Sequence, residues 1–484
     1  MFWNKFTAGA KEAPSVTVPP NAPSQSVAQP DLGNAGIPVK FNSVDFRDGQ
    51  QSLLATRVTT ADMIPVLTAM DKIGYDSMEM WGGATFDVMV RFLKIDPWNR
   101  IYTFKKFVKN TPLKMVCRGQ NLVGYHAYPD DIVERFIAAA ANAGIDVFLI
   151  FDALDDLRNC ETAFNAVKKA GKKIEGSVQY NISKYHTIEH FVSNAKEQER
   201  MGASLIHVED MAGLMTPAAS YELISALKKE LNVPVHLHCH CTGGLAVASY
   251  WEAIRAGVDG LDVCTSSLSM GPSLPAIETF AAALRGTSRD PKIDIGKFKS
   301  INRTFANYRK DLAEFESKLI GVDVGCLQHQ IPGGMLSNLE SQLTQMGCYN
   351  RLQDVLDEAI RVREDMGFPP LATPSSQMCG SQATMNVLTG KRYGVVSKEM
   401  KDYCRGMYGK APGPISPELM KAAIGDEEPL TGRPADYLEP GYEKAKKDSE
   451  GYARTEEDIL TWALFPENAK EFFIHKYQLK EGRN

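Results

Sequence analysis

The sequence contains no run of about 18 apolar residues, the minimum for a helix that crosses a membrane. No apolar core of the kind found in secretory signal peptides follows Met1. A basic excess is also missing, because 54 Lys and Arg residues are outnumbered by 59 Asp and Glu residues, and the formal net charge is −5. Without a broad basic surface, a nucleic-acid binder is not expected.

The cysteines show no pattern that would indicate disulfides. There are nine of them, an odd number, and their spacing does not repeat. Such a set is typical of reduced thiols rather than of a disulfide framework. The sequence therefore predicts a cytoplasmic protein, and docking onto a membrane complex stays open.

The length of 484 residues predicts more than one structural unit. The stretch from about Ala8 to Gly36 is rich in Pro, Ser, Ala, Gln and Asn and has no apolar period. We expect residues 1–36 to form a disordered N-terminal tail.

From Ile37 onward, short apolar runs alternate with helix-like stretches. Eight runs read as strands: 39–46, 77–81, 113–117, 146–152, 175–181, 205–209, 234–240 and 260–264. Eight repeated βα units predict an α/β fold with a (β/α)₈ TIM barrel over residues 37–320. A doubly wound sheet is the alternative, but no Gly-rich phosphate fingerprint follows the first strand.

The pattern changes after about Gly286. Stretches 297–319, 336–346, 352–366 and 376–388 look helical and have no strands between them. We expect residues 321–484 to form a mostly helical C-terminal domain that completes the active site at the barrel mouth.

The predicted strand ends carry a set of metal-binding residue types. His238 and His240 are two residues apart, so both imidazoles point to the same side of their strand, and Asp48 follows the first strand. Two imidazoles and a carboxylate suit Zn²⁺, Mn²⁺ or Co²⁺. A pair of satisfied core histidines is the alternative. His236 lies deeper on the same face and reads as structural or as support for the ligands.

Arg118 follows the third strand, where it can grip a substrate carboxylate with two hydrogen bonds. A structural salt bridge to Asp152 or Glu79 is equally compatible with the sequence.

Several ordered motifs carry a family resemblance. They are 47–57 (RDGQQSLLATR), 81–88 (WGGATFDV), 96–100 (DPWNR), 118–125 (RGQNLVGY), 151–159 (FDALDDLRN), 210–214 (DMAGL), 238–243 (HCHCTG), 330–339 (QIPGGMLSNL), 373–388 (TPSSQMCGSQATMNVL) and 425–440. Together they resemble the biotin-dependent carboxyltransferases, which include the carboxyltransferase domain of pyruvate carboxylase, the alpha subunit of oxaloacetate decarboxylase and the 2-oxo-acid subunit of methylmalonyl-CoA:pyruvate transcarboxylase.

The resemblance implies a reaction and roles for single residues. A carboxyl group would move between biotin on a partner chain and a small 2-oxo acid (pyruvate or oxaloacetate), by way of a metal-stabilised enolate. By this likeness Asp48, His238 and His240 look like the metal ligands. Gln51, Arg118 and Tyr125 look like the residues that hold the 2-oxo acid. Thr373 looks like the residue that moves a proton between biotin and the substrate methyl group, although it also suits an N-cap of the following helix.

The chain departs from the family at a few positions. Glu209 stands where the family usually has a carbamylated lysine that binds the metal, and we expect Glu209 to act as a ligand directly or through a water. Asp155 replaces a common Asn, Gly49-Gln50 replaces a common Ala-His, and Gln179 and Lys184 alter the segment after the fifth strand. These changes leave the accepted 2-oxo acid open.

The resemblance also implies partners. The sequence has no Ala-Met-Lys-Met biotin-attachment motif and no Gly-rich ATP-grasp segment. A separate biotin carboxyl carrier subunit and a biotin carboxylase or decarboxylase-complex subunit are therefore expected, together with a homodimer or larger assembly. Two alternatives remain: a metal-dependent 2-oxo-acid aldolase or lyase that ignores biotin, and a degenerate, non-catalytic scaffold subunit of a carboxylase complex.

Overall fold

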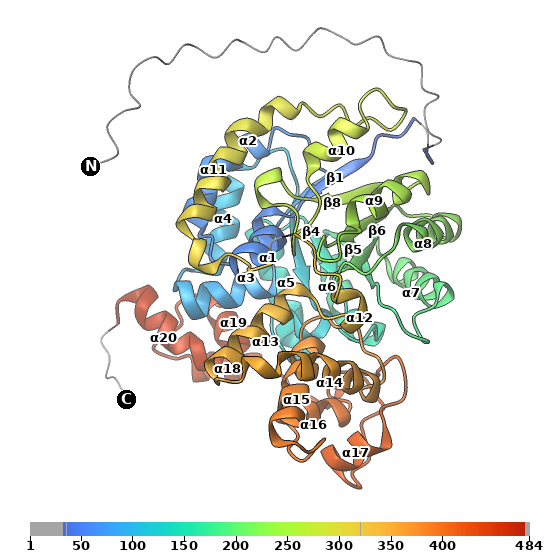
Figure 1. Ribbon diagram of the computed structural model, residues 1–484. Helices are drawn as coiled ribbons and strands as arrows, with labels where there is room; N and C mark the ends of the chain where they lie inside the picture. The colour runs from blue at the N-terminus through green and yellow to red at the C-terminus, as the bar shows by residue number, and fades with distance from the viewer. Residues whose placement is uncertain (1–31, 35, 320, 480–484) are drawn as a thin grey trace, which may run out of the picture. The chain divides into compact units, whose positions relative to one another are not determined.

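The computed structural model describes residues 32–34, 36–319 and 321–479. Eight parallel strands pair in chain order and close into a barrel in which β1 lies beside β8 (Figure 1). They are β1 (Lys40–Ser43), β2 (Ser77–Trp81), β3 (Leu113–Cys117), β4 (Val147–Ile150), β5 (Lys173–Gln179), β6 (Leu205–Asp210), β7 (Val235–Cys239) and β8 (Gly260–Val263). All eight expected strands are present, and the predicted barrel is confirmed.

Helices follow the strands and surround the barrel (Figure 1). They are α1 (Gln50–Leu54), α2 (Thr60–Met70), α3 (Gly83–Val88), α4 (Pro97–Phe107), α5 (Asp130–Ala143), α6 (Glu161–Lys169), α7 (Ile188–Met201), α8 (Pro217–Glu230), α9 (Ala246–Arg255), α10 (Ile277–Ala283) and α11 (Phe298–Asp311). The ends of α7 illustrate why they form where they do. The Thr187 hydroxyl accepts a hydrogen bond from the His190 N–H at the start, and Gly202 ends the helix in the left-handed region at φ 111°.

The end of the first strand differs from the prediction. A strand was expected to continue to Phe46, but β1 stops at Ser43, and residues 45–49 form a turn of π-helix closed by a 3.0 Å hydrogen bond from the Gly49 N–H to the Val44 carbonyl. The buried Asp45 carboxylate pins this turn by accepting hydrogen bonds from the Thr265 N–H and the Ser43 hydroxyl. Side-chain pairing of this kind is invisible to a period-2 pattern.

The region after the barrel is helical, as predicted. Its helices are α12 (Cys326–His329), α13 (Gly333–Gln345), α14 (Leu352–Asp365), α15 (Ser375–Thr389), α16 (Lys398–Cys404), α17 (Pro417–Ile424), α18 (Tyr442–Asp448), α19 (Glu456–Leu464) and α20 (Pro466–Tyr477). The helical stretch expected over 297–319 is wrong after Asp311, because α11 ends there and a short 3₁₀ turn follows.

This helical region packs in two different ways. Buried residues of α13 to α17 form a core of their own, which Leu154 joins from the loop after β4. The last helices instead share the barrel's hydrophobic core through residues such as Leu460, Phe465 and Phe472. The Trp98 indole N–H also donates to the Thr461 hydroxyl, so α19 is fastened to α4. Only part of the region between 321 and 484 therefore has a separate core; the domain boundary at 320 stays a prediction.

The predicted N-terminal tail, residues 1–36, lies mostly outside the described residues. Its last part differs from the expectation, because Leu32 is buried and the Gly33 N–H donates to the Arg255 carbonyl. The described packing on the barrel thus begins at Leu32. None of the helices in the described ranges has both the length and the apolar character that crossing a membrane requires.

Candidate active site at the barrel mouth

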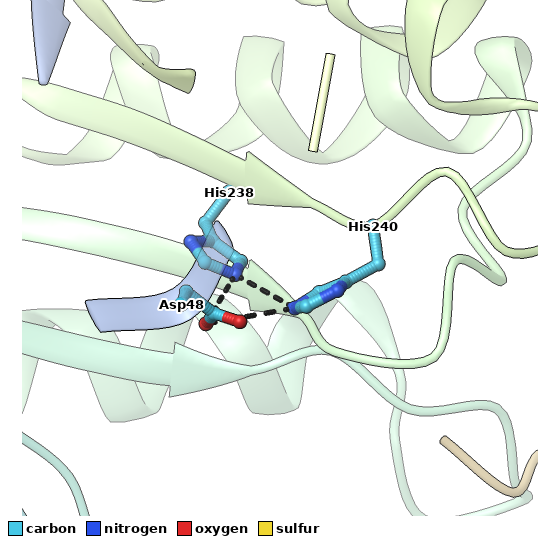
Figure 2. Close-up of side chains that lie close together, drawn as sticks. All are labelled: Asp48, His238 and His240. Carbon is cyan, nitrogen blue, oxygen red and sulfur yellow. Dashed lines mark hydrogen bonds and ion pairs between the residues drawn. The ribbon is translucent and has the colours of Figure 1, made fainter. Parts of the chain in front are cut away.

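Three predicted ligand residues meet at the carboxyl ends of β1 and β7. Asp48 comes from the π-helical turn after β1, His238 from β7, and His240 from just past the end of β7 (Figure 2). The Asp48 Oδ2 atom lies 3.6 Å from His238 Nε2 and 3.7 Å from His240 Nε2, and the two Nε2 atoms are 3.1 Å apart. All three residues are buried.

Neighbouring acceptors fix the orientation of both imidazoles. The His240 Nδ1 atom lies 2.6 Å from the Pro272 carbonyl, which can only accept, so Nδ1 carries the proton. The His238 Nδ1 atom lies 2.9 Å from Asp262 Oδ2. Burial alone would raise the pKa of Asp262, but Lys114 and the surrounding histidines hold it well below its usual value, so this carboxylate also accepts.

The donor set fits a metal ion. With both Nδ1 atoms donating, the two Nε2 atoms face each other and Asp48. Burial alone would lower the pKa of His238, but Asp262 and Asp48 raise it to about 9, so this pocket favours a positive charge, which a bound cation would supply in place of a proton. A tetrahedral ion bound at about 2.0–2.1 Å separates its ligand atoms by about 3.3 Å, and the observed separations of 3.1 to 3.7 Å surround that value. The predicted cluster is thus brought together with the spacing and the supporting hydrogen bonds of a metal site.

Arg47 belongs to this site, although no role was predicted for it. Its Nε donates to Glu79 at 2.5 Å and its NH1 lies 2.8 Å from Asp48 Oδ2. Burial alone would raise the pKa of Asp48, but Arg47 and His240 outweigh it and hold the pKa well below its usual value. The only sequence signal was an arginine next to the predicted ligand at a strand end.

Glu209 is at the same level of the barrel as the ligands. It pairs in register with His238 on β7 and with Gln179 on β5, and it is buried. Gln179 Nε2 donates to Glu209 Oε2 at 3.2 Å, whereas within the described residues no hydrogen-bond partner reaches Oε1. The tight cluster formed by Asp48, His238 and His240 does not include Glu209. Glu209 as a metal ligand stays a prediction.

The C-terminal helical region covers this part of the mouth. A small cavity is lined on the barrel side by Gln179, Tyr180, Asn181, Glu209, Met211 and Ala212, and on the other side by Gln330, Pro332, Pro370 and Leu371. The predicted family motif 330–339 therefore lies next to the strand ends, together with Pro370 and Leu371, which precede the motif 373–388.

Arg118 does not form the structural salt bridge that the sequence left open. Its NH1 donates to the carbonyls of Val123 and Gly124 at 3.1 and 2.9 Å, and its guanidinium carbon is 5.5 Å from the centre of the Tyr125 ring. In the described part of the chain no ion pair joins it to Glu79 or Asp152. Instead, Glu79 pairs with Arg47, and Asp152 accepts hydrogen bonds from backbone N–H groups and Asn159.

The remaining predicted substrate residues surround the mouth. The Tyr125 hydroxyl donates to Asp87 at 2.7 Å. Gln51 is half-buried in α1, whereas its neighbour Gln50 is buried and accepts from the Val58 N–H. Gly49 lies against Cys264, whose Sγ would be 2.8 Å from a Cβ at this position.

Thr373 is half-buried directly before α15. Its alternative role as a helix N-cap is wrong, because the cap position is Pro374 and no side chain caps this helix. The preceding residue, Ala372, packs with Val116, Leu149 and Phe151 at the ends of β3 and β4. Thr373 therefore stands beside the barrel mouth with its hydroxyl uncommitted to a cap.

His236, the two cysteines near the ligand histidines and Lys184 are not part of the ligand cluster. His236 is buried inside the barrel, where its Nδ1 lies 2.9 Å from Asn42 Nδ2. Cys239 and Cys241 are buried, and burial raises the pKa of Cys241 to about 12, so both remain apart from the ligand cluster as neutral thiols. Lys184 is exposed, 5.6 Å from the Phe368 ring of the helical region.

Comparison with known proteins agrees with this geometry. A family model described as HMGL-like matches residues 38–305, and one described as a conserved carboxylase domain matches residues 326–483. The chain is 49% identical to a pyruvate carboxylase subunit of Methanocaldococcus jannaschii, over 90% of this chain and 77% of that protein. It is 44% identical to the methylmalonyl-CoA carboxyltransferase 5S subunit of Propionibacterium freudenreichii, over 90% of this chain and 88% of that protein.

A solved structure is also similar to this chain. The carboxyl transferase domain of Rhizobium etli pyruvate carboxylase with pyruvate and biocytin superposes with a TM-score of 0.87 at 31% identity, covering 93% of this chain and 79% of that one. The fold is thus shared along nearly the whole chain. The protein is an enzyme of the biotin-dependent carboxyltransferase family.

Proposed function

We propose that the barrel mouth moves a carboxyl group between biotin, carried on a partner chain, and a small 2-oxo acid such as pyruvate. The observation that carries this proposal is the convergence of Asp48, His238 and His240 at the barrel mouth where Arg118 also lies, a half-buried cation without a carboxylate ion pair among the described residues. The relatives named for pyruvate carboxylation and carboxyl transfer support the same chemistry.

Asp48, His238 and His240 would hold a divalent ion, with Zn²⁺, Mn²⁺ and Co²⁺ all compatible with the donor set. A bound ion supplies Lewis-acid stabilisation of negative charge on a neighbouring substrate oxygen. The Pro272 carbonyl and the Asp262 carboxylate keep the two imidazoles oriented for this role. Arg47 keeps Asp48 ionised.

Arg118 would bind the carboxylate of the 2-oxo acid. Its NH1 is anchored by the Val123 and Gly124 carbonyls, so the guanidinium is held in place before substrate arrives. Its positive charge also stabilises the negative charge that develops when the substrate methyl group loses a proton. Tyr125, whose ring faces the Arg118 guanidinium, and Gln51, in α1, would also contact the bound 2-oxo acid.

Thr373 would carry the proton between the substrate methyl group and the ureido nitrogen of biotin through its Oγ1 atom. A hydroxyl can accept one proton while it donates another, which suits this relay. The packing of Ala372 on β3 and β4 supports the placement of Thr373 at the mouth. Biotin brings the carboxyl group to be transferred, or accepts it.

Glu209 would bind the ion directly or through a water, in place of the family's modified lysine. Its free Oε1 and its register with His238 support this role. Gln179 donates a hydrogen bond to the other oxygen, so two of the positions at which this chain departs from the family contact each other.

Metal analysis combined with oxaloacetate decarboxylation tests the proposal. The purified chain should contain bound divalent metal and should decarboxylate oxaloacetate to pyruvate when free biotin is supplied. His240→Gln should lower both metal content and rate, whereas His475→Gln, an exposed position on α20, should change neither. A metal-free wild-type chain that stays inactive after metal and biotin are added would contradict the proposal and favour the scaffold alternative.

A further inference from the structure

A second group of side chains of the types that bind metals lies outside the mouth cluster. It consists of Asp155 from the loop after β4, His186 from the loop after β5, and His190 from the first turn of α7. One ligand atom from each lies within 4.8 Å of the other two. His190 Nε2 and Asp155 Oδ2 are 3.9 Å apart, too far for a hydrogen bond.

All three residues direct an unpartnered polar atom into the gap. Asp155 Oδ2, His186 Nε2 and His190 Nε2 are buried, and among the residues that the structure describes none gives them a hydrogen-bond partner. His186 is only 7% exposed, and the Asp155 side chain only 4%. Buried polar atoms in native proteins are almost always satisfied by protein, water or an ion, so three orphaned atoms that face one another mark a place where a ligand can bind.

Local contacts position the backbone of His190 and the side chain of His186. The His190 N–H donates to the Thr187 hydroxyl at the start of α7. His186 Nδ1 lies 2.7 Å from Ser183 Oγ, which leaves Nε2 directed at the gap. Asp155 has a backbone φ of 59°, in the left-handed region that an aspartate adopts more readily than bulkier residues. The cited contacts of these residues are thus with their local surroundings and not with one another.

The electrostatic environment keeps His186 in the form that binds metals. Burial, assisted by His190 and Arg363, lowers the pKa of His186 to about 3, so its imidazole is neutral at pH 7. Neutral imidazole and carboxylate are ligands for divalent transition metals. The His190 side chain is 32% exposed, which gives an ion and its water ligands a route to the gap.

We propose that Asp155, His186 and His190 bind a second divalent transition-metal ion, with Zn²⁺ the best match to two imidazoles and one carboxylate. Ligand atoms on such an ion are about 3.3 Å apart, so the side chains need to close by only a fraction of the present 3.9 Å separation. This second site is separate from the mouth cluster, and its existence does not depend on the carboxyl-transfer reaction.

The position of the second site indicates its effect. The ion would tie the loops after β4 and β5 together behind Gln179, the residue that donates to Glu209. The same β5 loop contacts the helical region, because Arg363 NH2 donates to Asn181 Oδ1. Metal at this site thus stabilises the wall of the mouth that the helical region covers.

Cobalt binding to the full chain, stripped of metal with a chelator, tests the proposal. Co²⁺ is the probe because its visible absorption reports N/O ligation at each site. The wild-type chain should bind two Co²⁺ ions, and both Asp155→Asn/His190→Gln and Asp48→Asn/His240→Gln should bind one. A variant with all four substitutions should bind none, and the control His475→Gln should bind two.

Equal Co²⁺ stoichiometry in the wild type and in Asp155→Asn/His190→Gln would overturn the proposal. Thermal unfolding gives a second readout, because an ion that binds only the native state raises the Tm. In the Asp48→Asn/His240→Gln background, Zn²⁺ should raise the Tm, and adding His190→Gln should abolish that rise. His190 is partly exposed, so this single change should leave the metal-free Tm unchanged; a Zn²⁺-dependent rise that survives it would also overturn the proposal.

Discussion

Gln179 donates a 3.2 Å hydrogen bond to one carboxylate oxygen of Glu209, while no group in the described residues satisfies the other oxygen, Oε1. The two side chains lie opposite each other on β5 and β6, at the level of His238 on β7. A glutamate that is half satisfied and adjacent to a metal cluster has an oxygen available for an ion or its water.

The first prediction therefore concerns Glu209. Glu209→Gln should weaken divalent-metal binding by about 10- to 100-fold, because a charged oxygen ligand or its bridging water is lost. The dissociation constant, measured by competition with a chelator, checks this. Glu230 on α8 forms an exposed ion pair with Lys196 on α7, so Glu230→Gln is the matched control and should leave the dissociation constant unchanged.

A second substitution at position 209 tests whether the glutamate takes the place of the family's carbamylated lysine as a metal ligand. Glu209→Lys restores the residue type that the family uses, so its metal affinity should rise when bicarbonate is added, because carbamylation creates the missing carboxylate. Metal content and rate that match the wild type in both Glu209→Gln and Glu209→Lys would rule out Glu209 as a ligand.

Arg118 provides the second prediction. Arg118→Lys should lower kcat/KM for the 2-oxo acid by at least about tenfold, because lysine cannot bind a carboxylate through two hydrogen bonds while it remains anchored to the Val123 carbonyl. Arg135 forms an exposed ion pair with Glu456, so Arg135→Lys is the control and should leave kcat/KM unchanged. Unchanged kcat/KM in Arg118→Lys would remove Arg118 from the substrate site.

Thr373 provides the third prediction. Thr373→Ala should lower kcat by about 100-fold or more, because the proton relay is lost. The free energy of unfolding should change by less than about 0.5 kcal/mol, since Thr373 caps no helix. Thr373→Ser keeps a hydroxyl and should recover most of the rate. A serine variant as slow as the alanine variant would contradict a proton-transfer role.

The sequence predicted the barrel well and its mouth less completely. The bounds of β2 and β3 match the expected strands, because these strands are buried throughout and are flanked by clear turns. The end of β1 was predicted wrongly because it depends on a long-range contact. The Asp45 carboxylate accepts a hydrogen bond from the Thr265 N–H, which follows β8, and this contact favours a π-helical turn over a longer strand. His238, His240 and Asp48 were predicted to converge from their residue types, the spacing of the two histidines and their positions at strand ends, and the structure brings them together.

Other parts of the site depend on contacts that no local pattern contains. Arg47 joins the site only because Glu79 and Asp48 lie on either side of it. The group formed by Asp155, His186 and His190 combines two loops and a helix, and only the departure at position 155 marked it in the sequence. The packing of α18 to α20 on the barrel likewise depends on aromatic contacts, such as Phe86 with Phe465, between distant segments.

The fourth prediction concerns pH. Burial alone would raise the pKa of Glu175, but Lys114 at 3.1 Å and His207 lower it to about 2. The folded-state pKa lies below the unfolded value, so this carboxylate stabilises the fold above about pH 4.5, and the stabilisation is lost as the pH falls toward 2. Glu175→Gln should destabilise the protein at pH 7 by about 3 kcal/mol and by much less near pH 2. Denaturant unfolding at both pH values measures the difference; equal destabilisation at the two would contradict the ion-pair account.

The most direct measurement of the central claim is the rate of oxaloacetate decarboxylation by the metal-loaded chain with and without free biotin. Carboxyl transfer requires an acceptor, so the rate should rise with biotin concentration and saturate, and Thr373→Ala should abolish the biotin-dependent part. Decarboxylation that proceeds at the same rate without biotin would contradict the account and identify the site as a metal-dependent lyase.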